Sequence, residues 1–234
     1  SAITTLTAQN TLGVTAVHAA PTDHVEAQIR AVAEDLRPAA VKTGMLATAS
    51  LVETVAGSIQ EHGLGNYVLD PVMVATTGAR LLDQDAESAI IDALLPLCTL
   101  VTPNLDEAAL LARREIESEA DMRAVAEMLV AMGAGAALVK GGHLDGAEVV
   151  DILFDGESFH EWRRPKIETQ HTHGTGCTLS AAITAGLARG KGLVDAIEDA
   201  LDYVHRAIAS APGLGAGHGP LNHFVAADRV VAGD

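Results

Sequence analysis

Two patterns of apolar and polar residues alternate along the chain. In the longer segments apolar residues recur every three or four positions, which predicts helices over residues 23–36, 50–61, 83–95, 105–112, 118–132 and 193–210, with another helix after residue 177. Short apolar runs between them predict strands over residues 39–42, 66–70, 99–102 and 136–140. This order indicates an α/β fold with right-handed crossovers, in which a mostly parallel central sheet carries helices on both faces.

Two parts of the chain depart from this alternation. A β-like run opens the chain over residues 1–11. Residues 149–154 and 158–162 also have strand character, and the turn-forming pair Asp155 and Gly156 separates them. This spacing predicts a hairpin that forms an antiparallel edge of the sheet.

The composition fits a chain that buries a substantial core. Of the 234 residues, 48% are hydrophobic but only 3% are aromatic, so the core must be built from Ala, Val, Leu and Ile. The length suits one α/β domain as well as two small ones, and we expect residues 1–234 to form one domain. No internal repeat divides the chain.

The net charge and the cysteine count limit the kinds of binding partner and the cellular compartment that we expect. The net charge of −16 argues against nucleic acid or an anionic membrane as a partner. No apolar run reaches the ~18 to 20 residues of a membrane span, and no basic segment followed by an apolar core marks a signal peptide. Cys98 and Cys177 make no disulfide framework, so we expect a cytoplasmic protein.

A glycine-rich segment precedes the helix that follows Cys177. Gly174, Thr175 and Gly176 predict a tight turn that leads into a helix N-terminus, where free N–H groups can bind an oxyanion or a transferring phosphoryl group. The helix dipole would lower the pKa of Cys177, which could then take a proton from a substrate hydroxyl. The alternative is a glycine-rich helix start with a small buried cysteine.

Polar residues stand where three predicted strands end. Asp70 closes one strand, Asn104 and Glu107 follow another, and Lys140 closes a third, directly before two glycines. All would lie at the same edge of a parallel sheet, where ligands gather. Carboxylate and amide oxygens suit a hydrated Mg²⁺, and a lysine beside glycines can reach phosphate oxygens.

Each of these residues also has a structural explanation. Asn104 could cap the helix that starts at residue 105, with Glu107 as a first-turn acid. Asp70 could be a turn residue, and Lys140 a solvated strand end. Together with the anion-binding turn, however, they describe phosphoryl transfer, which needs positioning and charge neutralisation. The chain lacks the GxxxxGK[ST] motif, so it is not a P-loop enzyme.

Seven segments give the chain a specific resemblance. They are LTAQNT at 6–11, VKTGML at 41–46, DPVM at 70–73, TPNLDEA at 102–108, VKGGH at 139–143, HGTGCT at 173–178 and GHGPLNHF at 217–224. In these segments and their order, the chain resembles the hydroxymethylpyrimidine and phosphomethylpyrimidine kinases of thiamine biosynthesis, within the ribokinase-like superfamily. The resemblance implies a three-layer sandwich and a homodimer. It also implies transfer of the γ-phosphoryl group of ATP to 4-amino-5-hydroxymethyl-2-methylpyrimidine and then to its monophosphate.

The resemblance also implies roles for individual residues. Gln9 would read the aminopyrimidine edge, and Met45 and Val72 would line the pocket. The ATP phosphates would contact Lys140, Asn104 and Thr175, while Asp70, Asn104 and Glu107 would surround Mg²⁺. Gly174, Thr175 and Gly176 would form the anion hole. Cys177 would accept the hydroxyl proton or orient the hydroxyl group.

Other interpretations stay open. Gln9 could simply end a strand, and Met45 could fill the core. The family usually begins with a further strand and a Gly-rich loop, so the resemblance implies an N-terminally truncated chain with its first strand missing. Pyridoxal kinase is the nearest rival, although Gln9 favours a pyrimidine. A non-catalytic nucleotide-binding remnant, a cysteine hydrolase using Cys177, and a zinc site of His171, His173 and Cys177 are further alternatives.

Overall fold

The main sheet has six strands that follow one another in chain order. The computed structural model describes residues 1–73, 84–142 and 146–227. The strands are β3 (Val41–Thr43), β4 (Tyr67–Leu69), β5 (Leu100–Val101), β6 (Ala137–Val139), β7 (Glu148–Phe154) and β8 (Phe159–Pro165). Neighbouring strands from β3 to β6 are parallel, whereas β7 and β8 pair antiparallel. The predicted mostly parallel sheet with an antiparallel hairpin at one edge is confirmed.

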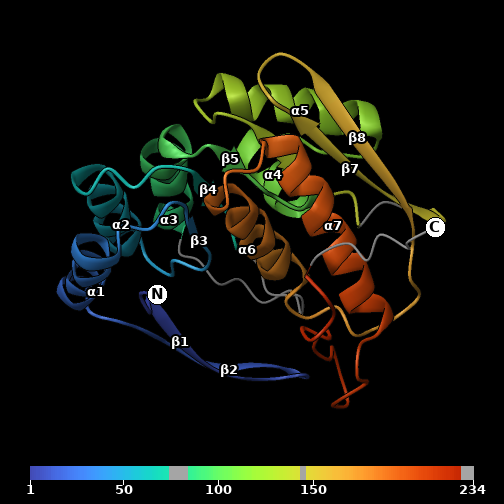
Figure 1. The fold of residues 1–234 in the computed structure, drawn as a ribbon, viewed down its shortest axis with the longest axis horizontal. Coiled ribbons are helices and arrows are strands. Elements are labelled where there is room, and N and C mark those ends of the chain that lie inside the picture. The colour runs from blue at the N-terminus through green and yellow to red at the C-terminus, as the bar shows by residue number, and fades with distance from the viewer. Residues whose placement is uncertain (74–83, 143–145, 228–234) are drawn as a thin grey trace.

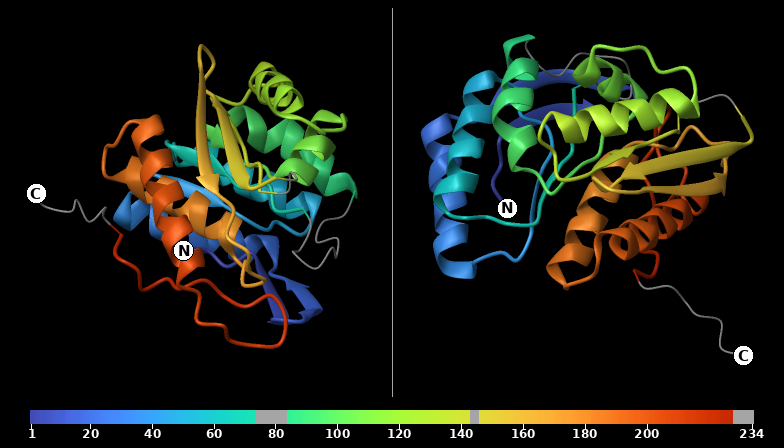
Figure 2. Two further views of the ribbon diagram at one scale, coloured as in Figure 1. Left: turned by 90° about the vertical axis from the view of Figure 1, so that its right-hand side faces the viewer. Right: turned by 90° about the horizontal axis from the view of Figure 1, so that it is seen from above.

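Helices cover both faces of this sheet (Figures 1 and 2). One face packs against α1 (Thr22–Leu36), α2 (Ala49–Glu61), α3 (Gln84–Ala89), α4 (Leu105–Ala112) and α5 (Glu119–Ala131). The other face packs against α6 (Thr175–Ala188) and α7 (Leu193–Ala209). Side chains alternate along each strand, so Val68 belongs to the α6 and α7 core while Leu69 belongs to the opposite core. The result is the predicted three-layer α/β arrangement.

The predicted helix over residues 83–95 differs in the structure. Asp83 lies outside the described residues, and α3 runs only from Gln84 to Ala89. A π-helical turn, Ile90–Leu94, and a 3₁₀ turn, Leu95–Leu97, follow it. The 3₁₀ turn contains Pro96, which has no N–H to continue an α-helical ladder. None of the described helices is both long and apolar enough to cross a bilayer.

The start of the chain forms a second, smaller sheet. β1 (Thr5–Asn10) and β2 (Gly13–Ala19) pair antiparallel as a hairpin that runs beneath the main sheet in the view of Figure 1. The β-like run at residues 1–11 is confirmed as β1, but β2 was not predicted. Its residues are small or weakly apolar, and most of the hairpin is exposed, so no buried face imposes an alternation on the sequence.

Candidate active site

The strand ends bring four predicted polar residues to one edge of the main sheet. Asp70 follows β4 and is only 1% exposed. The Nζ of Lys140, directly after β6, lies 3.5 Å from Asp70 Oδ1 and 3.9 Å from Glu107 Oε2. A parallel bridge joins Lys140 to Asn104, and the N–H of Lys140 donates to the carbonyl of Pro103 at 2.9 Å. The structure therefore assembles these residues as the strand order predicts.

Asn104 and Glu107 also form the capping box that the structural explanation anticipated. Asn104 Oδ1 accepts the Glu107 N–H at 2.9 Å, and Glu107 Oε2 accepts the Asn104 N–H at 2.8 Å. The capping geometry turns the Glu107 carboxylate toward the half-buried Lys140. Burial raises the pKa of Glu107 to about 7, although the charge of Lys140 opposes this shift.

Lys140 has a protected, charged environment. Burial of the ammonium lowers its pKa, but the carboxylates of Asp70 and Glu107 more than offset this, so its pKa lies above the ordinary value. The following residue, Gly141, donates its N–H to Asp151 Oδ1 at 3.1 Å. A Cβ at Gly141 would overlap the backbone of β7, so the close approach of the two segments requires glycine here. Asp151 thus holds the backbone that carries Lys140.

The helix start at the anion turn lies slightly earlier than predicted. Gly174 is the N-cap, with a left-handed φ of 85°, and α6 begins at Thr175. Thr175 donates both its N–H (3.2 Å) and its hydroxyl (2.7 Å) to the carbonyl of Thr172. In the described part of the chain, the N–H groups of Gly176 and Cys177 have no such acceptor. These two N–H groups are the ones positioned to bind an anion.

Gly176 brings the helix start against the charged edge of the sheet. A Cβ at Gly176 would lie 3.0 Å from Lys140 Nζ and 4.0 Å from Asp70 Oδ1. The unbonded N–H groups at the α6 N-terminus and the Lys140 ammonium therefore converge. Because a side chain at residue 176 would crowd this ammonium, glycine leaves the approach open.

The pKa of Cys177 is shifted in the direction opposite to the predicted one. Cys177 keeps part of its surface exposed. Desolvation of the sulfur and the nearby Asp70 carboxylate nevertheless raise the thiol pKa, and the charges of Lys42 and Lys140 only partly counter this shift. The prediction that the helix dipole makes Cys177 a thiolate is therefore wrong, because desolvation of the sulfur and the neighbouring Asp70 carboxylate oppose the dipole.

Sequence reasoning missed Lys42 and Ser180. Ser180, fully buried on α6, donates its hydroxyl to Asp70 Oδ2 at 3.0 Å. Lys42, on β3, donates to Ser180 Oγ at 3.1 Å and lies 3.8 Å from Asp70 Oδ2. A signal existed: residues 41–44 and 139–142 both have the form V-K-x-G at a strand end. No comparable signal identified the serine, which the sequence shows only as one small residue in a helix.

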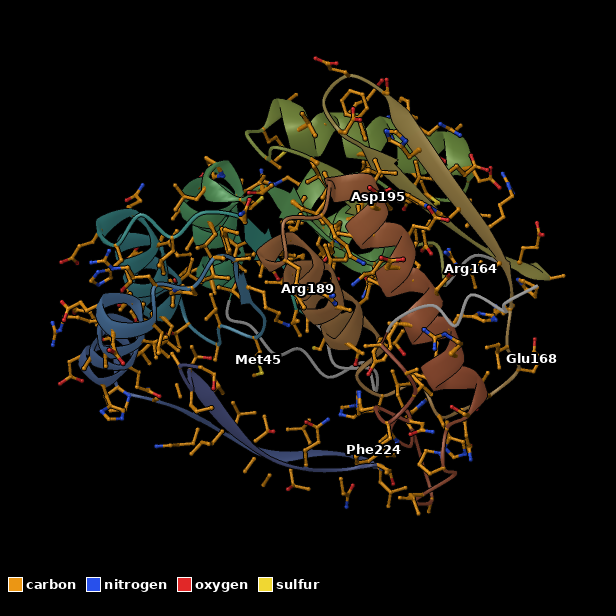
Figure 3. The ribbon with its side chains drawn as sticks, viewed as in Figure 1. Met45, Arg164, Glu168, Arg189, Asp195 and Phe224 are labelled. Carbon is orange, nitrogen blue, oxygen red and sulfur yellow. The ribbon has the colours of Figure 1, made fainter. Side chains whose placement is uncertain are left out.

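The residues predicted for the pyrimidine pocket lie on the β3 and β4 side of this edge. Val72 and Met45 are half-buried, and Figure 3 shows Met45 between the main sheet and the hairpin. The Thr4 hydroxyl donates to the Met45 carbonyl at 3.0 Å and ties the base of the hairpin to this segment. Gln9 is exposed on β1, and its Oε1 accepts from the Thr7 hydroxyl at 3.4 Å.

The tip of the hairpin is anchored at its other end. The carbonyl of Thr11 accepts the N–H of His218 at 2.8 Å, and the Thr11 hydroxyl oxygen accepts the N–H of Gly217 at 3.3 Å. A Cβ at Gly217 would overlap the Thr11 backbone. The same loop reaches the anion turn, since the His173 N–H donates to the Gly219 carbonyl at 3.2 Å. The hairpin that carries Gln9 is thus held beside both the β3 end and the α6 start.

The alternative zinc site is not assembled. Within the described residues, among them His171, His173 and Cys177, no group of three His, Cys, Asp or Glu side chains could hold a metal ion. Two carboxylates, Asp70 and Glu107, do converge, and both lie within 4 Å of the Lys140 ammonium.

Comparisons with known proteins agree with this geometry. A family model described as phosphomethylpyrimidine kinase matches residues 1–222. The chain belongs to this family. A relative from Bacillus subtilis named hydroxymethylpyrimidine/phosphomethylpyrimidine kinase is 47% identical over 225 residues, covering 96% of this chain and 83% of that protein. One of the same name from Rhizobium meliloti is 49% identical over 227 residues, 96% and 85% of the two chains. The family resemblance drawn from the seven segments is confirmed.

Solved structures of this family's fold are also similar. A pyridoxal kinase of Bacillus subtilis in an ADP complex matches with a TM-score of 0.88 and 36% identity, covering 95% of this chain and 85% of that one. A phosphomethylpyrimidine kinase from Clostridium difficile matches with a TM-score of 0.79 and 38% identity, covering 88% and 85%. This kinase family and its phosphotransferase fold therefore account for nearly the whole chain.

Proposed function

We propose that this family member transfers the γ-phosphoryl group of ATP to 4-amino-5-hydroxymethyl-2-methylpyrimidine and then to its monophosphate, in thiamine biosynthesis. The observation that carries the proposal is the approach of the α6 start to the sheet edge, where a Cβ added at Gly176 would lie 3.0 Å from Lys140 Nζ, beside Asp70. Phosphoryl transfer needs this combination of N–H donors and a fixed cation. The names of the relatives support the choice of acceptor.

ATP and Mg²⁺ fit the same edge. The carboxylates of Asp70 and Glu107 both face the ammonium group of Lys140, so their oxygens already converge on one positive charge. Oxygen ligands of this kind suit Mg²⁺, which when bound neutralises phosphate charge. We assign these two residues to the ion and Lys140 to the ATP phosphates. The Asn104 carboxamide oxygen is engaged in the capping box, so Asn104 contributes by orienting Glu107.

The α6 start has the role of an anion hole. The N–H groups of Gly176 and Cys177 would donate to oxygens of the transferring phosphoryl group. Gly174 sets the backbone turn, and Thr175 holds it through its two bonds to Thr172. Because the pKa of Cys177 is raised, its thiol keeps its proton at neutral pH. We therefore assign Cys177 the orientation of the substrate hydroxyl.

The acceptor would lie between the β3 end and the hairpin. Met45 and Val72 would contact the pyrimidine ring, and Gln9 would hydrogen-bond its amino and ring-nitrogen edge. The two anchors of the hairpin, at Thr4 and Thr11, support this assignment, because they hold β1 beside the strand ends.

Pyridoxal phosphorylation is the second candidate. It rests on the similarity to pyridoxal kinase structures, including the TM-score of 0.88 with the Bacillus subtilis protein. The two candidates differ in the acceptor and share the phosphoryl-transfer edge.

The test offers the two alcohols and the pyrimidine monophosphate separately with Mg-ATP, and measures ADP release together with the mass of each product. We expect the pyrimidine to gain one phosphoryl group and its monophosphate to gain a second. Faster turnover of pyridoxal would replace the proposed acceptor. A folded chain that binds ATP and phosphorylates none of the three would support a non-catalytic protein.

We further propose that residues 1–234 act as one kinase domain in a cytoplasmic homodimer. Apolar side chains are exposed along the hairpin and its approach, at Ile3, Leu6, Leu12 and Val17, and exposed apolar surface of this kind favours a partner. Sedimentation equilibrium would measure the mass directly, and a mass of one chain at micromolar concentration would exclude the dimer.

A further inference from the structure

Lys42 has an environment that the phosphoryl-transfer scheme above leaves unexplained. Its side chain reaches from β3 toward α6, is 24% exposed, and donates to Ser180 Oγ at 3.1 Å. Its Nζ also lies 3.8 Å from Asp70 Oδ2. A lysine in the middle of a three-residue strand thus places an ammonium group at the active edge and still keeps part of its surface open.

The two lysines stand on opposite sides of one carboxylate. Asp70 Oδ1 faces Lys140, and Asp70 Oδ2 faces Lys42. The strand order separates the two backbones, since β3 and β6 flank β4 and β5. Lys140 therefore belongs to the side with Asn104 and Glu107, where ATP and Mg²⁺ are assigned.

Lys42 belongs to the other side, where the acceptor is assigned. It precedes Gly44 and Met45 in the chain, and an added Cβ at Gly44 would lie 3.6 Å from Lys42 Nζ. Thr4 ties the base of the hairpin to Met45, three residues after Lys42. The ammonium group therefore lies between the proposed pyrimidine pocket and the acid at the centre of the edge.

The two acceptors of the proposed reaction differ in charge. The first is a neutral alcohol, whereas the second carries a phosphate with about −1.5 to −2 charges at neutral pH. In the second transfer a phosphate oxygen of the acceptor attacks the γ-phosphorus of ATP. The bond from that phosphorus to the bridging oxygen breaks, and ADP leaves with the electron pair. Two highly charged phosphates must approach, so a cation on the acceptor side lowers their repulsion.

We propose that Lys42 binds the phosphate of the monophosphorylated acceptor and is needed chiefly for the second phosphoryl transfer. This inference rests on the proposed function, because it requires that one site use both acceptors. It adds a residue that discriminates between the two acceptors by charge, separate from the residues that bind ATP.

The test compares both acceptors in the same variants at saturating Mg-ATP. Lys42→Met should lower kcat/KM for the monophosphate by about 100-fold or more, because a charged hydrogen-bond donor to a phosphate is lost. Its kcat/KM for the alcohol should fall by less than about tenfold. Lys42→Arg keeps the charge and should retain most of the second activity. Should Lys42→Met fail to fold, Lys42→Gln removes the same charge and keeps a donor for Ser180.

Ser180→Ala is the matched control, because it disturbs Asp70 and Lys42 without removing the cation. It should lower both activities in the same proportion. Equal proportional losses in Lys42→Met would mean that Lys42 acts only on Asp70, and would overturn the proposal. Wild-type protein is assayed first with each acceptor. If it phosphorylates neither pyrimidine, the proposed function itself is wrong, and the role of Lys42 falls with it.

Discussion

The sheet edge and the hairpin, to which we assign the two halves of the site, are built differently. At the edge, Asp70 and Glu107 are buried, and each carboxylate has several partners at fixed distances. The hairpin is mostly exposed and is held to the main body chiefly through its base, at Thr4, and its tip, at Thr11. On the proposed assignment, phosphoryl transfer would take place at rigid strand ends, whereas the acceptor would be recognised by an element with fewer contacts to the main body.

The largest expected effect comes from the centre of the edge. Lys140→Met should lower kcat by about 10³-fold or more, because the fixed cation beside the transferring group is lost. ADP release at saturating substrates measures it. Arg114→Met is the control, since Arg114 pairs with Asp121 in the first turn of α5. A loss of less than tenfold in Lys140→Met would remove Lys140 from the phosphoryl-transfer machinery.

A somewhat smaller effect is expected at the thiol. Cys177→Ala should lower kcat for the pyrimidine alcohol by about 10²-fold, because the substrate hydroxyl loses a partner that orients it. Cys177→Ser restores a hydroxyl donor and acceptor and should recover most of the rate. Cys98→Ala changes the other cysteine, which is buried in the core, and should leave kcat unchanged. Inactivity of Cys177→Ser, with an intact fold, would favour a thiolate base instead.

Asp151, which accepts the Gly141 N–H at the sheet edge, should make the stability of the fold depend on pH. Burial raises the pKa of Asp151 to about 6 from 3.8. Its folded pKa lies above its unfolded one, so the ionised carboxylate destabilises the fold above pH 6. This cost disappears as the pH falls from about 6 to about 4. We therefore compare the free energy of unfolding of Asp151→Asn with that of wild type at each pH. The difference should favour the variant by about 3 kcal/mol more at pH 7 than at pH 4.

Asp155→Asn provides a control of opposite sign. Backbone N–H donation from Ser158 and the contact with His160 lower the pKa of Asp155 to about 2. Its contribution is present above its unfolded pKa and is lost as the pH falls, so Asp155→Asn should lose stability at pH 7 relative to wild type. Urea unfolding at several pH values measures both variants. If the free energy of unfolding changed with pH equally in wild type and Asp151→Asn, the raised pKa of the Asp151 carboxyl would be contradicted.

The smallest effect is expected at the hairpin tip. Gly217→Ala places a Cβ into the Thr11 backbone and should release this anchor. We expect KM for the pyrimidine to rise about tenfold while KM for ATP stays near its wild-type value, because only the acceptor side loses support. Hydrogen exchange in residues 5–19 should become faster. Gly65→Ala, where an added Cβ meets nothing within 4 Å, is the control. Equal changes in both KM values would show that the tip acts on the whole site.

The two halves also differ in how far the sequence predicts them. Asp70, Asn104 and Lys140 could be placed together because parallel strands end at one edge, so strand ends far apart in sequence become neighbours. The hairpin was predicted only as β1, since an exposed β2 carries no apolar alternation. Ser180 escaped prediction because its role arises from a contact with Asp70, 110 residues away.

The raised pKa of Cys177 was not predicted either, because it too depends on tertiary contacts. A helix N-terminus lowers a thiol pKa, but the sequence does not show how closely Asp70 approaches or how far the sulfur is desolvated. Local rules thus predicted the turn at Gly174 and failed where tertiary contacts decide the electrostatics.

Gly176→Ala tests most directly the central claim that the α6 start and Lys140 together perform phosphoryl transfer. Alanine favours a helix, so the variant should be as stable as wild type or up to about 1 kcal/mol more stable. Its Cβ would crowd Lys140 Nζ at 3.0 Å, and kcat should fall by about 10²-fold. Gly57→Ala, in α2 with nothing within 4 Å, should gain similar stability with unchanged kcat. A stable Gly176→Ala protein with wild-type kcat would contradict the account.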